Sequence, residues 1–449
     1  MKLFADLKIR FEQPNWARNP ELGLIDTILE QRPDLLDIVK DDIVGNSKNS
    51  KFGRKDVPSV ETIMRAAIYK EIKGLDYREL EYHQEDSRIC ALFLKIDELR
   101  PYSFQVYQKY ISRISEESLQ KLLIEINKIA IDLGLEDIKK IRQDSTVAEV
   151  NIHRPTNNSL VWDCIKTSHN LLKKLSKEQP NFKYKNYLKS AKKNYYKINN
   201  TKGKGKEEKI KKLFRNQLIL FTKTINSLTN VVKIMNDFNI NAYIIATQIE
   251  AFIPMCEKVY SQTKRLQIDG EQVPNEEKVF SIYEPHTNII VKGARDVKFG
   301  HKLDLAGGKS NLILICAILQ GNPSDVKSYQ KTLQSIKSNY GKTPESTSND
   351  GGYASKENIK FAQNFGIKNI VFNKMVGSMR NVVSSKSMET RLKKWRSGME
   401  AVISNLKRGF ELRRIVWKGF EHFKSKVLWS VIAYNIRVMT GLILAEMKL

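Results

Sequence analysis

The sequence predicts an α/β fold: a sheet flanked by helices, with an all-helical N-terminal region and a large helical insertion after the first strand. Apolar residues recur at helical spacing over residues 1–134 and 156–278. β-rich segments occur at 135–155 and again, alternating with helices, over 279–449. We therefore predict a helical N-terminal region at 1–134, an α/β core formed by 135–155 and 279–449, and a helical insertion at 156–278.

The charge of the chain favours a polyanionic partner. Its 449 residues include 76 Lys and Arg against 50 Asp and Glu, a formal net charge of +26. Such a surplus repels itself unless an anionic partner offsets it, which argues against an ordinary metabolic enzyme. A hydrophobic content of 41% excludes global disorder. We expect nucleic acid as the partner.

Cysteine spacing and apolar runs indicate the compartment. The four cysteines are far apart, which argues against a zinc finger and a disulfide scaffold. The longest apolar run, Leu312 to Leu319, is too short to span a bilayer. Residues 1–10 lack the apolar core of a signal peptide. We expect a reducing cytoplasm.

The N-terminal region reads as successive helices. Ser59 is a cap residue before a helix that ends at Gly74, and a long amphipathic helix ends at Gly134. The helix 104–114 carries Gln108 and other polar residues on one side, which suits insertion into a DNA major groove. A solvated helix face is the simpler explanation of that pattern.

The first strand precedes the most basic segment of the chain. Ile138 to Ile152 is predicted to be a strand with Asp144 near its end. Residues 166–215 then hold seventeen Lys and Arg and three acids, a net +14, with tyrosines interleaved. Lysines neutralise phosphates and tyrosines stack on bases, so we predict DNA contact. The alternative is a solvated helical hairpin. Candidate phosphate contacts are Lys192, Lys193, Lys211 and Lys212.

Strands and helices alternate after Pro274. A polar strand at 343–349 leads to Asp350, which lies at a sharp turn before a helix. The other predicted strands are Val279–Tyr283, Asn288–Val291, Val297–Leu305, Leu312–Gln320 and Ile367–Phe372. The predicted helices are Val326–Ser338, Ser355–Phe365 and a long helix from Ser387 to Lys407.

Three acids stand out by context. Asp144 and Asp350 lie at element ends, and Glu400 lies in the last of these helices. At about 100° per residue, Arg396 and Lys407 share one face with Glu400 to within roughly 40°. Surface pairing of Arg396 with Glu400 is the simpler explanation. Three carboxylates from separate elements are nevertheless what a Mg²⁺ pair needs for phosphodiester chemistry.

The sequence around these acids resembles a known family. Gln143-Asp144-Ser145-Thr146-Val147, Asn349-Asp350-Gly351-Gly352-Tyr353 and the Arg396, Glu400, Lys407 spacing resemble the DDE transposases of bacterial insertion sequences. The resemblance runs from about Val57 to the C-terminus. The stretches 153–157, 321–325 and 409–413 are similar to those of the ISNCY-type group.

The resemblance implies an RNase H-like core with a mixed sheet. Asp144, Asp350 and Glu400 would be catalytic ligands of two Mg²⁺ ions, with Mn²⁺ as a possible substitute. Arg396 and Lys407 match the Arg-Glu-Lys signature of the family and would contact phosphate. The tyrosine that usually precedes the arginine by three positions is replaced by a lysine here.

The implied function is DNA transposition. The helical region 1–134 would recognise transposon ends in double-stranded DNA. The core would cleave the DNA and join the freed ends to target DNA. The implied assembly is a homodimer or larger complex in the bacterial cytoplasm, associated with the nucleoid. The resemblance places no part of this protein in a membrane.

Several alternatives stay open at this stage. Glu389 and Glu411 are further candidates for the third metal ligand. The same carboxylates would serve a Mg²⁺-dependent nuclease without strand transfer. A third possibility is an inactive DNA-binding remnant of a transposase, whose core is only a scaffold.

Overall fold

The computed structural model describes residues 14–45, 57–97, 100–292, 296–374 and 379–447. The chain divides into two compact units. One consists of Met1–Asn151 and Gly300–Leu449, and the other of Ile152–Phe299. The first unit holds the three candidate acids, and the second holds the basic segment.

The N-terminal part of the first unit is helical, as predicted. Ser59 caps α5 by accepting a hydrogen bond from the amide of Thr62, and Gly74 ends that helix in the left-handed conformation. The helices are α2 (Pro14–Ala17), α3 (Pro20–Gln31), α4 (Asp34–Val44), α5 (Val60–Lys73), α6 (Tyr77–Asp86), α7 (Arg88–Leu94), α8 (Phe104–Ile111) and α9 (Glu116–Asp132).

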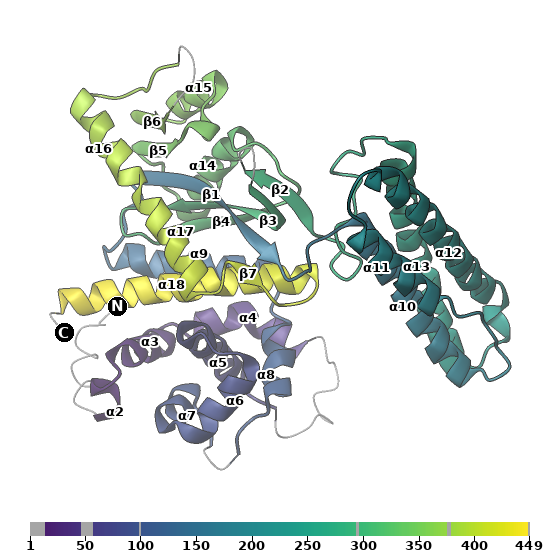
Figure 1. The fold of residues 1–449 in the computed structure, drawn as a ribbon. Coiled ribbons are helices and arrows are strands. Elements are labelled where there is room, and N and C mark those ends of the chain that lie inside the picture. Colours follow the sequence, from purple (N-terminus) through teal and green to yellow (C-terminus); the bar gives the residue numbers. More distant parts are fainter. Residues whose placement is uncertain (1–13, 46–56, 98–99, 293–295, 375–378, 448–449) are drawn as a thin grey trace. The chain divides into compact units, whose positions relative to one another are not determined.

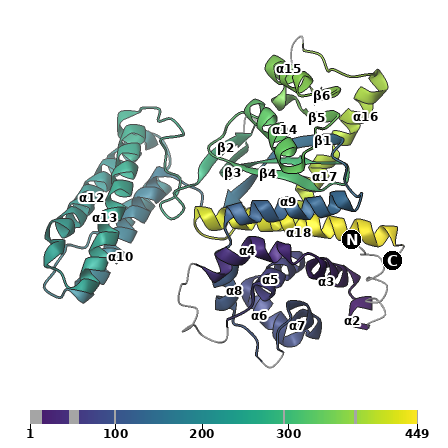
Figure 2. The same cartoon turned by 180° about the vertical axis from the view of Figure 1, so that it is seen from behind.

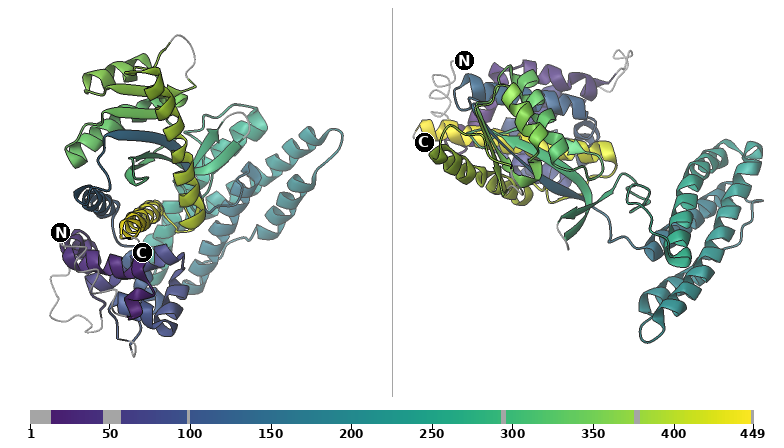
Figure 3. Two further views of the ribbon diagram at one scale, coloured as in Figure 1. Left: turned by 90° about the vertical axis from the view of Figure 1, so that its left-hand side faces the viewer. Right: turned by 90° about the horizontal axis from the view of Figure 1, so that it is seen from above.

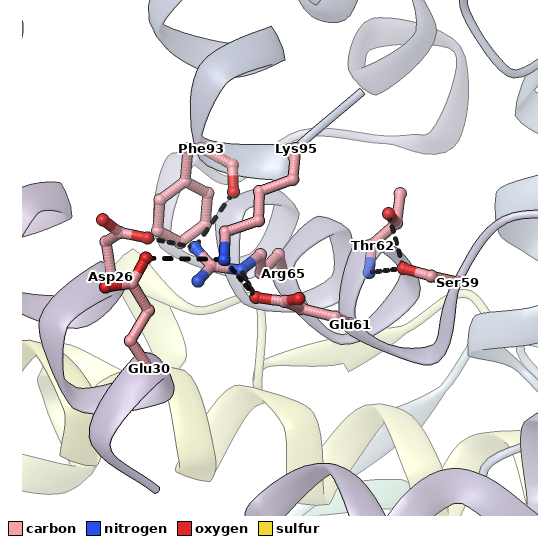
Figure 4. Close-up of polar contacts among 8 residues, drawn as sticks. All are labelled: Asp26, Glu30, Ser59, Glu61, Thr62, Arg65, Phe93 and Lys95. Atoms are coloured by element: carbon pink, nitrogen blue, oxygen red, sulfur yellow. Dashed lines mark hydrogen bonds and ion pairs between the residues drawn. The ribbon is translucent and has the colours of Figure 1, made fainter. Parts of the chain in front are cut away.

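A charged cluster joins three of these helices (Figure 4). Arg65 of α5 is fully buried and lies 2.6 Å from Asp26 of α3 and 2.9 Å from Glu61 of its own helix. It also donates a hydrogen bond to the carbonyl of Phe93 in α7. Lys95 lies 2.8 Å from Glu61. Because a buried charge needs these partners, the cluster fixes how α3, α5 and α7 pack.

The strands form one seven-stranded mixed sheet. The main order is β2-β3-β1-β5-β6, with β4 paired to β3 and β7 to β1. β1 is antiparallel to β3 and parallel to β5, and the β1–β5 ladder ends at the pair Gln143 and Asn349. The strands are β1 (Lys140–Val150), β2 (Asn288–Lys292), β3 (Asp296–Gly307), β4 (Ile313–Leu319), β5 (Ser346–Asp350), β6 (Asn369–Asn373) and β7 (Arg414–Ile415).

Helices cover both faces of this sheet. α16 and α17 cross the face seen in Figure 1, and α14 and α9 lie on the face seen in Figure 2. The helices of this part are α14 (Val326–Tyr340), the short 3₁₀ helix η4 (Gly351–Tyr353), α15 (Lys356–Asn364), α16 (Lys386–Arg396), α17 (Gly398–Gly409) and α18 (Phe420–Glu446).

The C-terminal helix α18 joins the two layers of the first unit. It runs between the N-terminal helices and the sheet (Figures 1 and 2), and it contacts α3, α5, α9 and β4. Among the described residues it is the one helix long and apolar enough to cross a membrane. Most of its apolar stretch is buried inside the fold, however. Its composition is therefore that of a core helix.

The second unit is dominated by long helices packed side by side (Figure 3). Its core is formed by apolar residues such as Leu172, Phe221 and Ile249, which are fully buried. The helices are α10 (Asn157–Glu178), α11 (Leu188–Asn200), α12 (Lys206–Ile234) and α13 (Ile240–Lys264), with the short helices η2 (Met235–Asp237) and η3 (Arg265–Asp269).

Three local predictions were wrong. Val279–Tyr283 is not a strand, because the amides of Tyr283 and Glu284 bond to the hydroxyl of Ser281 and form a turn. Asp144 lies in the middle of β1 and not near its end, because the strand pairs with β3 on both sides of that residue. The predicted helix from Ser387 to Lys407 is two helices, α16 and α17, which meet at Ser397.

Candidate active site

The three candidate acids come from three elements of the first unit. Asp144 lies one residue beyond the end of the β1–β5 ladder, and Asp350 is the last residue of β5. Glu400 is in the first turn of α17. Because β1 and β5 are parallel neighbours, the two aspartates lie at the same end of the β1–β5 ladder, each one residue beyond its last pair.

One arginine contacts all three carboxylates. Nη2 of Arg396, the last residue of α16, lies 3.3 Å from Oδ2 of Asp144 and 3.2 Å from Oε1 of Glu400. Its Nη1 lies 3.9 Å from Oδ1 of Asp350. Acids that are 206 and 50 positions apart in the sequence are thus gathered around a single guanidinium.

The cluster is negatively charged and open on one side. The side chains of Asp350 and Glu400 are 47% and 65% exposed, whereas those of Asp144 and Arg396 are 18% and 10% exposed. One arginine offsets one of the three negative charges. The remaining charge and the exposed oxygens suit the binding of further cations.

The break between α16 and α17 positions Arg396 and Glu400. The buried guanidinium of Arg142, on β1, donates a hydrogen bond to the carbonyl of Trp395 at 2.7 Å and another to Oδ1 of Asn311. It also lies over the ring of Trp395. A Cβ atom on Gly398 would overlap Nη1 of Arg142. The helix therefore breaks where a glycine allows this close approach.

A buried polar network lies behind the site. The carboxylate of Asp304, on β3, accepts hydrogen bonds from Gln143, Thr332 and Tyr353. Burial raises the pKa of Asp304, although these hydrogen bonds act in the opposite direction. Gln143 and Tyr353 flank the candidate acids in the sequence, so the network touches both segments that carry the aspartates.

The other predicted residues of this region lie nearby or have other partners. Lys407 is half-buried on α17, about two turns beyond Glu400. Glu389 pairs with Lys393 at 2.6 Å, and Glu411 pairs with the buried Lys426 at 2.9 Å. Neither of these two glutamates is among the acids that contact Arg396.

The candidate phosphate contacts of the second unit lie on its helices. Lys192 and Lys193 are exposed on α11, and Lys192 lies over the ring of Tyr196. Lys211 and Lys212 lie in the second turn of α12, where Lys212 is exposed and lines a shallow groove with other lysines. These side chains are accessible to a DNA backbone.

The donor set of the acidic cluster fits divalent metal ions. Within the described residues, no group of three or more His, Cys, Asp or Glu side chains is close enough to hold a metal as it stands. Arg396 lies between the three carboxylates. The cluster nevertheless offers only carboxylate oxygens, the ligands that Mg²⁺ and Mn²⁺ prefer.

Comparison with known protein families agrees with this geometry. Residues 268–436 match the family described as the transposase DDE domain. This segment of the chain is therefore similar to a transposase DDE domain. The matched segment includes Asp350, Arg396, Glu400 and Lys407, and begins after Asp144. No curated protein and no solved structure matches the chain.

The match confirms the predicted family and the predicted α/β fold with an RNase H-like core. It supports a transposase-type, nucleic-acid-cleaving enzyme with DNA as its partner, from a family that generally uses divalent metal ions. The finer assignment to the ISNCY-type group stays a prediction.

Sequence reasoning did not identify two residues that shape the candidate site. Arg142 lies two positions before Asp144, so strand alternation places both on one face of β1. Asp304 is an acid between two leucines in a predicted strand. A charge at a position expected to be buried was a signal for both residues.

Proposed function

We propose that this protein is a transposase that binds the ends of its own mobile element, cleaves the DNA there and joins the freed 3′ ends to target DNA. Asp144, Asp350 and Glu400 are the proposed catalytic ligands of two Mg²⁺ ions, which Mn²⁺ can replace. The observation that carries this proposal is the meeting of the three acids around Arg396.

Each residue has a distinct role in this account. The three carboxylates hold the divalent ions, which supply Lewis-acid activation of the attacking oxygen and stabilise the leaving oxygen. Arg396 offsets the charge of the carboxylates in the metal-free enzyme. We also assign a phosphate contact to Arg396, because a guanidinium binds phosphate oxygens through charge-assisted hydrogen bonds. Lys407 adds a second cation on α17.

The remaining basic residues bind DNA away from the reacting phosphate. The segment 166–215, with its net charge of +14, holds the DNA backbone through Lys192, Lys193, Lys211 and Lys212. The helical region 1–134 recognises the ends. Since two ends have to be joined in one reaction, the active assembly is a homodimer or larger. It acts on bacterial DNA in the cytoplasm, where it associates with the nucleoid.

Two reactions with the full-length protein test the proposal. In the first, DNA that carries the sequences flanking the gene is incubated with and without Mg²⁺, and nicking is measured. In the second, pre-cleaved ends are incubated with a target plasmid, and joined products are measured. The Asp144→Asn variant, which keeps the size of the side chain, is the matched control.

We expect Mg²⁺-dependent nicking and joined products with the wild type and neither with Asp144→Asn. Nicking without joined products would indicate a nuclease that lacks strand transfer. If the two proteins bind DNA but give the same level of nicking with and without Mg²⁺, the protein is an inactive DNA-binding remnant. That result would contradict the proposal.

A further inference from the structure

We infer that Asp304, a buried residue outside the acidic cluster, is a positioning residue that sets the spacing between Asp144 and Asp350. This inference rests on the proposed function, because it concerns the same site. It assigns to Asp304 a role that depends on four hydrogen bonds and on the register of the sheet.

The first link runs from Asp304 to the strand of Asp144. Nε2 of Gln143 donates to Oδ2 of Asp304 at 2.6 Å, and both side chains are 1% exposed. Gln143 directly precedes Asp144 on β1, so its side chain points to the opposite face of the sheet. The position of Gln143 therefore fixes the backbone from which Asp144 projects toward Arg396.

The second link runs to the turn that follows Asp350. The hydroxyl of Tyr353 donates to Oδ1 of Asp304 at 2.8 Å, and Tyr353 is 1% exposed. Tyr353 is the last residue of η4, the short helix that begins directly after Asp350. Asp304 thus contacts both the strand that carries Asp144 and the short helix that follows Asp350.

A third contact closes the network across the sheet. Nδ2 of Asn349 donates to Oε1 of Gln143 at 3.0 Å. These two residues form the last pair of the β1–β5 ladder, and the next residue on each strand is a candidate catalytic acid. The side-chain bond therefore locks the point at which the two strands separate.

The chemistry of the network favours positioning over simple stabilisation. A buried carboxylate is costly unless donors surround it, and apolar replacements of buried charges often leave stability unchanged or improved. A carboxylate provides what an apolar side chain cannot: two acceptor oxygens that fix donors from β1, η4 and α14 at once. Thr332 of α14 is the third donor, at 3.0 Å from Oδ2.

Two variants test this inference in the full-length protein. Tyr353→Phe removes one hydroxyl and only the link to η4. Asp304→Asn keeps the size of the side chain but replaces one acceptor oxygen with a donor. The control is Ile336→Ala, which creates a cavity at a fully buried residue of α14 that belongs to a different cluster.

The measurements are the Kd for Mn²⁺ of the folded protein, by calorimetry, and the nicking rate at saturating Mn²⁺. For both network variants we expect the Kd to rise by about tenfold, as when a group that orients a metal ligand is lost. We expect the rate to fall by roughly 100-fold, since a displacement of about 1 Å has an effect of that size. Ile336→Ala is expected to lower stability and leave the Kd for Mn²⁺ unchanged.

A wild-type Kd and rate in the folded Tyr353→Phe protein would overturn the inference and leave the proposed function in place. A Kd that changes equally in Ile336→Ala would also overturn it, because the effect would then follow stability alone. A wild-type protein that neither binds Mn²⁺ nor nicks DNA would overturn the proposed function and this inference together.

Discussion

The guanidinium of Arg142 donates a hydrogen bond to the carbonyl of Trp395, 253 positions further along the chain, at 2.7 Å. This bond connects the strand of Asp144 to the residue that directly precedes Arg396. It ties the two halves of the candidate site together through the backbone of α16. The contact depends on the absence of a side chain at Gly398.

Substitution of Gly398 by Ala should therefore destabilise the protein by about 1–3 kcal/mol, the usual cost of overpacking a buried site. The atom that a Cβ would meet is the end of an arginine side chain, but two hydrogen bonds hold it in place. Urea unfolding checks this. Gly409→Ala is the matched control, because a Cβ there meets nothing within 4 Å. Equal stability of the two variants would contradict the account of the break.

Substitution of Arg396 by Gln should raise the affinity for Mn²⁺ by about tenfold and abolish cleavage. Arg396 competes with a metal ion for three carboxylates, and three partly exposed ion pairs together amount to roughly 1–2 kcal/mol. Calorimetry measures the affinity. Arg391→Gln removes the same charge from the exposed face of α16 and should change neither property. A weaker Mn²⁺ affinity in Arg396→Gln would show that the arginine assembles the site and does not compete for it.

Acid should destabilise the contact between the N-terminal helices and α18. Burial alone would raise the pKa of Glu71, but Lys426 at 2.5 Å and Lys70 at 3.0 Å hold it below its ordinary value. For a lowered carboxyl pKa, the stabilisation is fully present above the ordinary value of 4.5 and is lost as the pH falls through the lower value in the folded protein.

Glu71→Gln should therefore lower the free energy of unfolding at pH 7 by about 3–5 kcal/mol, because among the described residues it leaves the buried Lys70 without its carboxylate partner and leaves Lys426 with Glu411 alone. The difference from wild type should shrink as the pH falls below 4.5 and through the lowered pKa of Glu71. Urea unfolding at several pH values measures both effects. Glu117→Gln breaks an exposed pair with Lys121 and should cost less than about 1 kcal/mol. A pH-independent difference would refute the assignment to ionised Glu71.

Replacement of Lys192, Lys193, Lys211 and Lys212 by Gln should weaken DNA binding more at low salt than at high salt. Each lost phosphate contact makes the negative slope of log K against log salt shallower by about 0.9. The magnitude of the slope should therefore decrease by roughly 3 to 4. Fluorescence anisotropy over a salt series measures it. Gln replacement of four exposed lysines of the same unit outside the basic segment, Lys223, Lys233, Lys258 and Lys264, is the control. An equal loss of DNA affinity in the two variants would show that the segment 166–215 is not a specific part of the DNA interface.

The sequence predicted the parts of the fold that follow local patterns. Alternation located β3 and β4 to within two residues, and helical spacing located α5 and α9. The polar strand β5 was also predicted. Its residues 346–349 are buried, because their hydroxyl and amide groups find partners such as Tyr329 and the carbonyl of Leu392. Those partners come from other elements, so burial of β5 did not follow from its own sequence.

The candidate site was likewise predicted only in part. Asp144, Asp350 and Glu400 were predicted from motifs that resemble a family, and the chain brings them to one arginine. The break between α16 and α17 was not predicted, because Arg142, which donates a hydrogen bond to Trp395 beside the break, lies more than 250 positions away in the sequence. Asp304 was missed for the same reason: its donors come from three other elements.

Mg²⁺-dependent nicking by single variants of the three acids tests the central claim most directly. Asp144→Asn, Asp350→Asn and Glu400→Gln each remove one carboxylate and keep its size. Each should bind DNA like the wild type and nick it about 100-fold or more slowly, and the double variants should be no slower than the singles, because the acids act as one unit. A single variant that nicks at the wild-type rate would contradict a shared metal site.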